Sequence, residues 1–286
     1  MILSLFISVS SIKFKKRKRY SQYSYITLKI NSRGNISIYN VLIKKFCENL
    51  PPPPDEVLIN DVNQSEIKPY YDFNKSQNII KLVWKNNIKT AACMFYLCIN
   101  ITEMNLSHFN SSEITYMVSM FEKCTSLYSL ELSNFDTSKV NNFGNMFDGC
   151  SSLTSLDLSS FITTSIVWMN SMFNACPLLE YIDLENSIIN PNQTGGVFNR
   201  ISENIIVCTK GEKWKEILNG YDLYINCFIN KTENFHHKCY KKKFNQALSN
   251  KHICKKCGNI FHQKYNETYN NFFPILIAIN ILIIFI

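Results

Sequence analysis

The C-terminal part of the chain carries cysteines and histidines at spacings that could bind a metal ion. Cys254, Cys257 and His262 follow a C-x-x-C-x4-H pattern, and Cys239 or His237 can serve as a fourth ligand. Such a set suits tetrahedral Zn²⁺. However, the last cysteine of a zinc knuckle is absent, and in an exported protein these cysteines would more often form disulfides. The compartment decides between the two interpretations, and our main expectation is a protein without metal or other cofactor.

Four further cysteines recur at a constant spacing. Cys98, Cys124, Cys150 and Cys176 lie 26 residues apart, each three residues after the phenylalanine of a Met-Phe pair. A column of thiols could bind metal ions. The spacing also places these cysteines on an apolar stripe, however, and there a free cysteine behaves as a small buried hydrophobe. We therefore expect them to fill the core.

A second repeated set is polar. Asn105, Glu131, Asp157 and Asp183 recur with the same period. Carboxylates on neighbouring strands, about 4.8 Å apart, would suit a cation or a basic ligand, so these four are the candidate ligand-binding residues. The alternative is that they are only solvated polar positions. Two flanking columns follow the same period: Glu103, Ser129, Ser155 and Tyr181, and Ser107, Ser133, Ser159 and Glu185.

No arrangement typical of an enzyme accompanies these residues. The sequence contains no H-E-x-x-H motif, no phosphate-binding glycine loop, and no recognisable set of nucleophile, histidine and carboxylate. The net charge of +8 comes largely from two local runs, KFKKRKR at 13–19 and YKKK at 240–243. A general nucleic-acid-binding face is therefore not indicated. We expect a non-enzymatic protein that does not bind nucleic acid.

The elements that position these columns come from a 26-residue repeat. In one unit, Leu127, Leu130 and Leu132 form an L-x-x-L-x-L motif that ends in the alternation of a short strand. The apolar positions that follow, 140, 143, 146, 147 and 150, have the spacing of one helix face. Each unit is thus predicted to be strand, turn and helix. Stacked units would form an α/β repeat, a leucine-rich-repeat solenoid, over residues 87–198.

The units MFEKCTSLYSLELSNFDTSKVNNFGN and MFDGCSSLTSLDLSSFITTSIVWMNS resemble the 26-residue repeat of the BspA-like leucine-rich-repeat surface proteins. The resemblance covers about residues 87–190. It implies an exposed surface protein that takes part in adhesion or in host and matrix contact, without catalytic activity. No binding residues of that family are defined well enough to be transferred to this chain.

Flanking segments complete the predicted organisation. Residues 1–22 are apolar and then basic and are a candidate signal peptide, although a misplaced start or a nuclear address would fit too. Short alternating runs predict a small β-rich N-terminal cap over 23–86. A C-terminal cap is expected over 199–229, where two strands end in Cys208 and Cys227 and could be joined by a disulfide. A basic stalk containing cysteine and histidine follows over 230–271.

The last fifteen residues, 272–286, are apolar apart from one asparagine. They are short for a membrane span, which needs about 20 residues, and fit a removable lipid-anchor signal or a marginal tail anchor. We therefore expect a membrane-attached cell-surface protein that binds protein or glycan ligands through the strand face of the repeats. The alternative function is an intracellular zinc-binding or nucleic-acid-associated scaffold.

Overall fold

The computed structural model describes residues 23–40, 47, 49–184, 188–202, 205–209, 212–220, 225–229 and 237–241. Within these ranges it does not describe the side chains of 163–166, 188–193, 212–213, 219–220, 225–229 and 237–241. The chain forms two compact units, Met1–Tyr224 and Ile225–Ile286. In the described part of the second unit, β14 (Ile225–Ile229) and β15 (His237–Lys241) form an antiparallel pair.

The first unit begins with short strands separated by turns. They are β1 (Ser24–Ile30), β2 (Gly34–Ser37), β3 (Glu56–Ile59), β4 (Val62–Asn63), β5 (Tyr70–Phe73) and β6 (Asn78–Trp84). β2 pairs with β5, and the other four lie in one sheet in the order β4-β3-β6-β1. In β1, apolar residues alternate with more polar ones, as expected for a strand with one buried face. Ile26, Leu28 and Ile30 are fully buried, and the residues between them are not.

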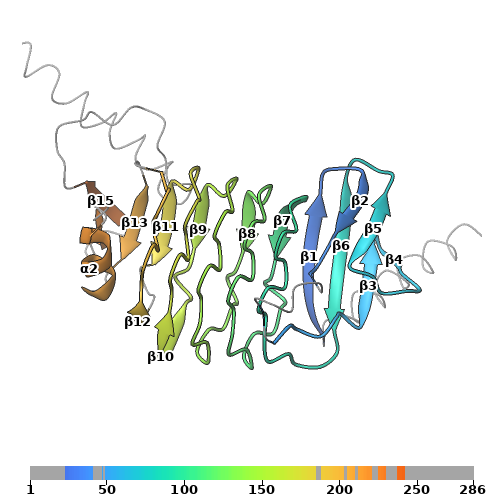
Figure 1. Ribbon diagram of the computed structural model, residues 1–286, viewed down its shortest axis with the longest axis horizontal. Coiled ribbons are helices and arrows are strands. Elements are labelled where there is room, and N and C mark those ends of the chain that lie inside the picture. Colours follow the sequence, from blue (N-terminus) through green and yellow to red (C-terminus); the bar gives the residue numbers. More distant parts are fainter. Residues whose placement is uncertain are drawn as a thin grey trace, which may run out of the picture. The chain divides into compact units, whose positions relative to one another are not determined.

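The same sheet continues into the repeats. β7 (Ile101–Asn105) is antiparallel to β1, and β8 (Ser129–Glu131) is parallel to β7 with partners 26 residues apart. β9 (Ser155–Asp157), β11 (Tyr181–Leu184) and β13 (Ile206–Thr209) form a parallel sheet beyond it. β8 and β9 lie next to each other, so each repeat unit adds one strand to the same side of the stack (Figure 1). The repeats and the N-terminal strands thus share one hydrogen-bonded side.

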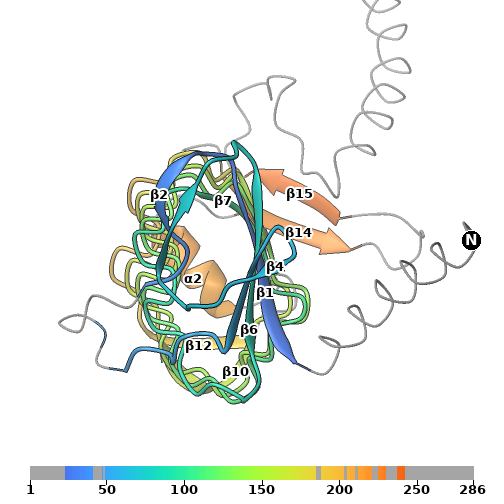
Figure 2. The same cartoon turned by 90° about the vertical axis from the view of Figure 1, so that its right-hand side faces the viewer.

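A second side of the coil lies half a repeat away in the sequence. Thr90, Tyr116, Asn142 and Trp168 occupy one position of successive units and are linked by parallel bridges. The ladder ends in β10 (Ile162–Trp168) and β12 (Ile188–Gln193), which are parallel to each other. Viewed along the stack, β10 and β12 lie on a different side of the coil from β1 and β6 (Figure 2).

The helix predicted in each repeat is wrong. Within the described residues there is one helix, α2 (Glu212–Gly220), which lies after the repeats. Residues 118–124 instead form successive turns: the amides of Glu122 and Cys124 donate to carbonyls three residues back, whereas those of Phe121 and Lys123 donate to the next unit. Ser119 and Lys123 have φ values of 55° and 60°, which an α-helix does not allow. The expected α/β leucine-rich-repeat solenoid is therefore replaced by a strand-and-turn stack with mixed sheets.

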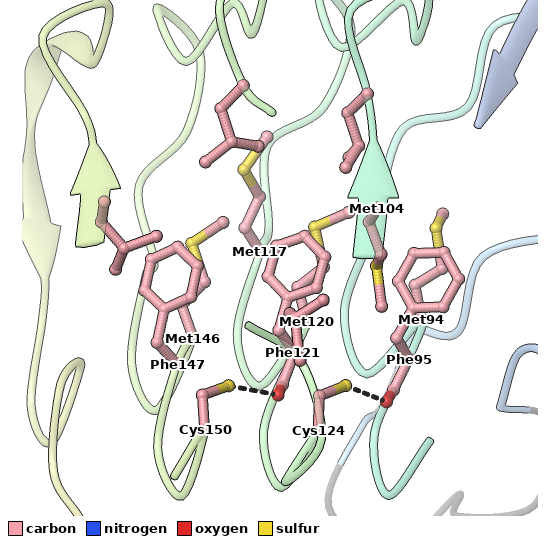
Figure 3. Packing of buried hydrophobic residues seen from close by; sticks show 14 of the residues in the cluster. Met94, Phe95, Met104, Met117, Met120, Phe121, Cys124, Met146, Phe147 and Cys150 are labelled. Carbon is pink, nitrogen blue, oxygen red and sulfur yellow. Dashed lines mark hydrogen bonds between the residues drawn. The ribbon is translucent and has the colours of Figure 1, made fainter. Parts of the chain in front are cut away.

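Aromatic rings form the core of this stack. Phe95, Phe121, Phe147, Phe173 and Phe198 overlie one another with ring centroids 5.4–5.9 Å apart. Methionines and cysteines of the same turns pack around these rings (Figure 3). At the end of the ladder, the indole of Trp214 from α2 lies 6.4 Å from Phe198, so this helix packs against the last ring. Each unit therefore buries its apolar face against its neighbours.

A disulfide that the sequence did not predict joins the N-terminal segment to the first turn of the repeats. Cys47 and Cys93 are bonded, with Cα atoms 6.2 Å apart and a sequence separation of 46. Cys208 is also disulfide-bonded. The side chain of Cys227 lies outside the described part, so the predicted Cys208–Cys227 pairing stays a prediction.

Candidate binding face

The outward side chains of β7, β8, β9 and β11 form a surface that we call the strand face. In β7 and β9, Met104 and Leu156 point into the core and are buried. The residues directly before and after each of them point the other way, because successive side chains of a strand alternate. The strand face consists of Glu103, Asn105, Ser129, Glu131, Ser155, Asp157, Tyr181 and Asp183.

The structure places the four candidate ligand-binding residues in one column. Asn105 is the Cα partner of Glu131, and Asp157 is the partner of Asp183. The first three side chains are exposed, but Asp183 is only 3% exposed and Tyr181 donates a hydrogen bond to its Oδ2 over 3.3 Å. Two exposed carboxylates, those of Glu131 and Asp157, are therefore what the column offers to a ligand.

These polar side chains also stabilise the turns that follow the strands. Asn105 Oδ1 accepts a hydrogen bond from the Ser107 amide at 2.9 Å, and Glu131 Oε1 accepts one from the Ser133 amide at 2.9 Å. Asp157 Oδ1 accepts one from the amide two residues on, at 3.1 Å. Such bonds hold each side chain in one orientation. The column is thus structural as well as exposed, and its carboxylates are preorganised.

A charged cluster at the N-terminal end of the strand face was not found from the sequence. Lys29 Nζ of β1 lies 2.6 Å from Glu103 Oε2, and the Tyr128 hydroxyl donates to Glu103 Oε1 over 2.7 Å. The hydrogen bond from Lys29, followed by the one from Tyr128, lowers the pKa of the Glu103 carboxyl below its usual range. Lys29 and Glu103 are 74 residues apart, so only the pairing of β1 with β7 brings them together.

This pKa shift predicts a pH-dependent difference in stability. The pKa of Glu103 is lowered by folding, so its contribution should be present above the ordinary glutamate pKa and be lost as the pH falls through the folded-state value. At neutral pH, wild type should therefore melt slightly above Glu103→Gln, and the gap should close in acid. Thermal melts at a series of pH values measure this. A gap that keeps its size in acid would contradict the assigned ion pair.

A serine and a histidine also meet at the end of β7. Ser107 Oγ lies 3.0 Å from His108 Nδ1, which resembles the start of a nucleophile–base pair. The hydroxyl, however, donates to Asn105 Oδ1 over 2.6 Å, and the His108 ring stacks on Tyr25 with centroids 4.5 Å apart. Because the Ser107 hydroxyl donates its hydrogen bond to Asn105 Oδ1, it does not donate to His108, and the histidine is not placed to remove its proton.

The repeated cysteines fill the core. Cys98, Cys124, Cys150 and Cys176 are free and buried. The thiol of Cys124 donates to the Phe95 carbonyl over 3.1 Å, and that of Cys150 donates to the Phe121 carbonyl over 3.0 Å (Figure 3). Burial raises the pKa of Cys98 and of Cys176 to about 12. The thiols therefore stay protonated, which suits neither metal binding nor nucleophilic chemistry.

The alternative zinc ligands lie on β15 or outside the described residues. Cys239 lies on β15 directly opposite Cys227 of β14, but neither side chain is described. Cys254, Cys257 and His262 lie outside the described residues. The described part of the chain holds no cluster of three potential metal ligands. Likewise, none of the described helices is long and apolar enough to span a bilayer, and residues 1–22 and 272–286 are outside the description.

A small open pocket lies beside the N-terminal strands. Its volume is about 170 Å³, and it is lined by Tyr23, Ser24, Trp84, Lys85, Asn86, Asn87, His108 and Asn110. Lys85 is held by Glu56 at 3.0 Å, and the Trp84 indole nitrogen donates to the Pro52 carbonyl. The groups best suited to hold a ligand are thus already bonded within the protein, and we do not assign a function to this pocket.

Comparison with known proteins gives one family match. Residues 72–199 are similar to a family described as "Mycoplasma protein of unknown function, DUF285". No curated protein and no solved structure matches the chain. The expected membership of the BspA-like leucine-rich-repeat surface proteins is therefore wrong, because the matched family is a different one. The surface location and adhesion that this resemblance implied lose that support as well.

Proposed function

We propose that this chain is a non-enzymatic recognition protein that binds a partner through the strand face. The observation that carries the proposal is the array of exposed side chains on neighbouring parallel strands, with Asn105, Glu131 and Asp157 at one repeated position. A flat array of this kind offers many weak contacts in place of one deep pocket. Such a surface suits a macromolecule better than a small substrate.

The rigidity of the scaffold favours binding. The side chains of the face are fixed by bonds to the turns, and the strands beneath them are tied to the next unit by backbone hydrogen bonds such as Leu106 N to Glu131 O at 2.9 Å. A partner would meet a surface that needs little further ordering. Because ordering of side chains is one of the main costs of association, preorganisation raises affinity.

The chemistry of the face indicates a basic polypeptide as the partner. Glu131 and Asp157 present exposed carboxylates on consecutive units, whereas the Lys29 ammonium is taken up by Glu103 at 2.6 Å. Carboxylates held in fixed orientations can accept hydrogen bonds from lysine or arginine side chains. Electrostatic complementarity of this kind mainly sets the rate of association and the choice of partner.

The Cys47–Cys93 disulfide supports export from the cell. Disulfides persist in oxidising compartments and are rare where thiols are kept reduced. We therefore propose a location outside the cytosol, where the partner would be met. Attachment to a membrane through residues 272–286 stays a prediction. The alternative of an intracellular zinc-binding scaffold needs a reducing compartment, and thus an open Cys47–Cys93 pair.

The proposal can be tested with an oligolysine peptide as the probe. Calorimetric titration should show salt-sensitive binding to wild type, and Glu131→Lys should weaken it by about fivefold, because one exposed ion pair contributes at most about 1 kcal/mol. Glu113→Lys is the matched control, since it makes the same charge change at a half-exposed glutamate that pairs with Lys139 outside the strand face. If both variants lose the same affinity for oligolysine, only the net charge of the protein matters, and the assignment of binding to the strand face is overturned.

A further inference from the structure

The ladder half a repeat away from the strand face exposes two large aromatic side chains. Tyr116 and Trp168 occupy the same position of two units that have one further unit between them. Their side chains are 42% and 49% exposed. Asn142 lies between them on the same ladder. We call Tyr116, Asn142 and Trp168 the aromatic column. An indole and a phenol that are half exposed on a regular ladder are surfaces on which a ligand can stack.

The backbone holds this column in place. The Tyr116 carbonyl accepts a hydrogen bond from the Ala91 amide at 2.9 Å, and Trp168 donates to Asn141 and accepts from Phe143, at 3.0 and 2.8 Å. Neighbouring rungs of a parallel ladder are about 4.8 Å apart, so the two aromatic positions are separated by about 10 Å. The spacing is therefore fixed by backbone hydrogen bonds and does not depend on a mobile loop.

Two asparagines accompany the aromatic residues: Asn142 lies on the same ladder, and Asn170 follows Trp168 by two residues. Asn142 Oδ1 accepts a hydrogen bond from the Gly144 amide at 2.8 Å. A Cβ atom at Gly144 would lie 3.1 Å from the side-chain oxygens of both Asn142 and Asn170, so the glycine leaves room for these two amides. One hydrogen-bonding residue, Asn142, thus lies between the two stacking residues of the column.

We propose that the aromatic column binds a neutral, extended β-1,4-linked polysaccharide. The apolar faces of pyranose rings stack on indole and phenol rings, and the hydroxyls at the ring edges bond to side-chain amides. In a β-1,4-linked chain successive rings are turned over, so every second ring presents the same face. That repeat is similar in length to the separation of Tyr116 and Trp168. Asn142 would then contact the ring between them.

Other partners fit this surface less well. A protein partner would need a contiguous apolar centre that excludes water, but Asn142 separates the two aromatic residues, and Thr115 and Asn141 flank them. A single-stranded nucleic acid could stack on the rings, but it requires a positively charged groove. Here the nearby Lys139 is paired with Glu113 at 2.8 Å, and Lys89 interacts with the same carboxylate. These lysines share an acidic partner and do not line a positively charged groove, so the combination of aromatic and amide groups matches a neutral glycan better.

Titration of the full-length protein with cellohexaose and chitohexaose tests the proposal. Wild type should bind at least one of them, with an affinity that hardly changes between low and high salt. Trp168→Ala and Tyr116→Ala should each weaken binding by about tenfold, the loss expected when one stacking surface is removed. Trp168→Tyr keeps a stacking ring and should retain most of the affinity, which separates lost stacking from misfolding.

Tyr128→Ala is the matched control, because Tyr128 is 44% exposed but lies beside the strand face. It should leave hexasaccharide binding unchanged, as should Glu131→Lys. The proposed polysaccharide site and the proposed function of the strand face can therefore be overturned independently of each other. No binding of either hexasaccharide, binding that is lost at high salt, or equal losses in Tyr128→Ala and Trp168→Ala would each overturn the polysaccharide site.

Discussion

Replacement of Phe121 by alanine is expected to lower the free energy of unfolding by about 3–5 kcal/mol, the range for a large aromatic side chain removed from a core. The Phe121 ring is fully buried and stacks on Phe95 and Phe147, with centroids 5.9 and 5.6 Å away. Its loss would leave a cavity in the middle of the ladder and separate the units on either side. Urea denaturation of wild type and variant measures the difference.

Tyr128→Ala is a suitable comparison for this variant, since it also removes an aromatic ring but from a side chain that is 44% exposed. Tyr128→Ala should lower the free energy of unfolding much less than Phe121→Ala does. If Phe121→Ala costs less than about 1 kcal/mol, the phenylalanine ladder is not the core of the stack, because a cavity of that size cannot form so cheaply.

Loss of the Cys47–Cys93 disulfide is expected to have an effect of similar size. The bond closes a loop of 46 residues, and the chain-entropy relation for a loop of this length gives about 4 kcal/mol. Cys47→Ser should therefore unfold at a clearly lower urea concentration than wild type. Addition of a reductant should lower the stability of wild type more than that of the variant, because the variant has already lost the Cys47–Cys93 bond and both retain the disulfide of Cys208.

Cys124→Ala provides the contrast, because Cys124 is a free, buried cysteine. Cys124→Ala keeps the Cys47–Cys93 bond, so reductant should destabilise this variant as it destabilises wild type. In a digest of the oxidised protein, mass spectrometry should find Cys47 linked to Cys93. A reductant effect that persists in full in Cys47→Ser would place the stabilising bond elsewhere in the chain.

The period of the repeat and the burial of its apolar positions could be read from the sequence. Leu156, Phe147 and Cys150 are all buried as their spacing indicates, since a 26-residue period repeats the environment of each position. The strand at each L-x-L could be located for the same reason. Periodicity reports which side chains face the core, however, and not the backbone conformation that brings them there.

The helix prediction was wrong because the spacing of buried residues does not define the backbone conformation. Positions 143, 146, 147 and 150 have helical spacing, but successive turns that close over three residues bury the same set. A signal was present in the sequence: Asn145 and Gly149, both tolerant of positive φ, occupy the two positions where φ is 55° and 71°. In the unit before, serine and lysine adopt the same conformation, because hydrogen bonds to the next unit hold them there.

The site could be predicted only in part. The column of Asn105, Glu131, Asp157 and Asp183 follows from the period, but the burial of Asp183 does not, since a regular repeat suggests equal exposure. The Lys29–Glu103 pair and the Cys47–Cys93 bond join the N-terminal strands to the first repeats. Contacts of this kind between a flanking segment and a repeat depend on how the two dock, and no periodic pattern records that.

Surface labelling of intact cells that express the chain tests the central claim, an exported recognition protein, most directly. A membrane-impermeant amine reagent should modify exposed lysines such as Lys29 and Lys139, which are about half exposed, without prior lysis. Lysed cells show the full extent of labelling and so serve as the reference. The account predicts similar labelling of the chain in both samples. Labelling that appears only after lysis would contradict export, and with it the proposal that the strand face meets a partner outside the cytosol.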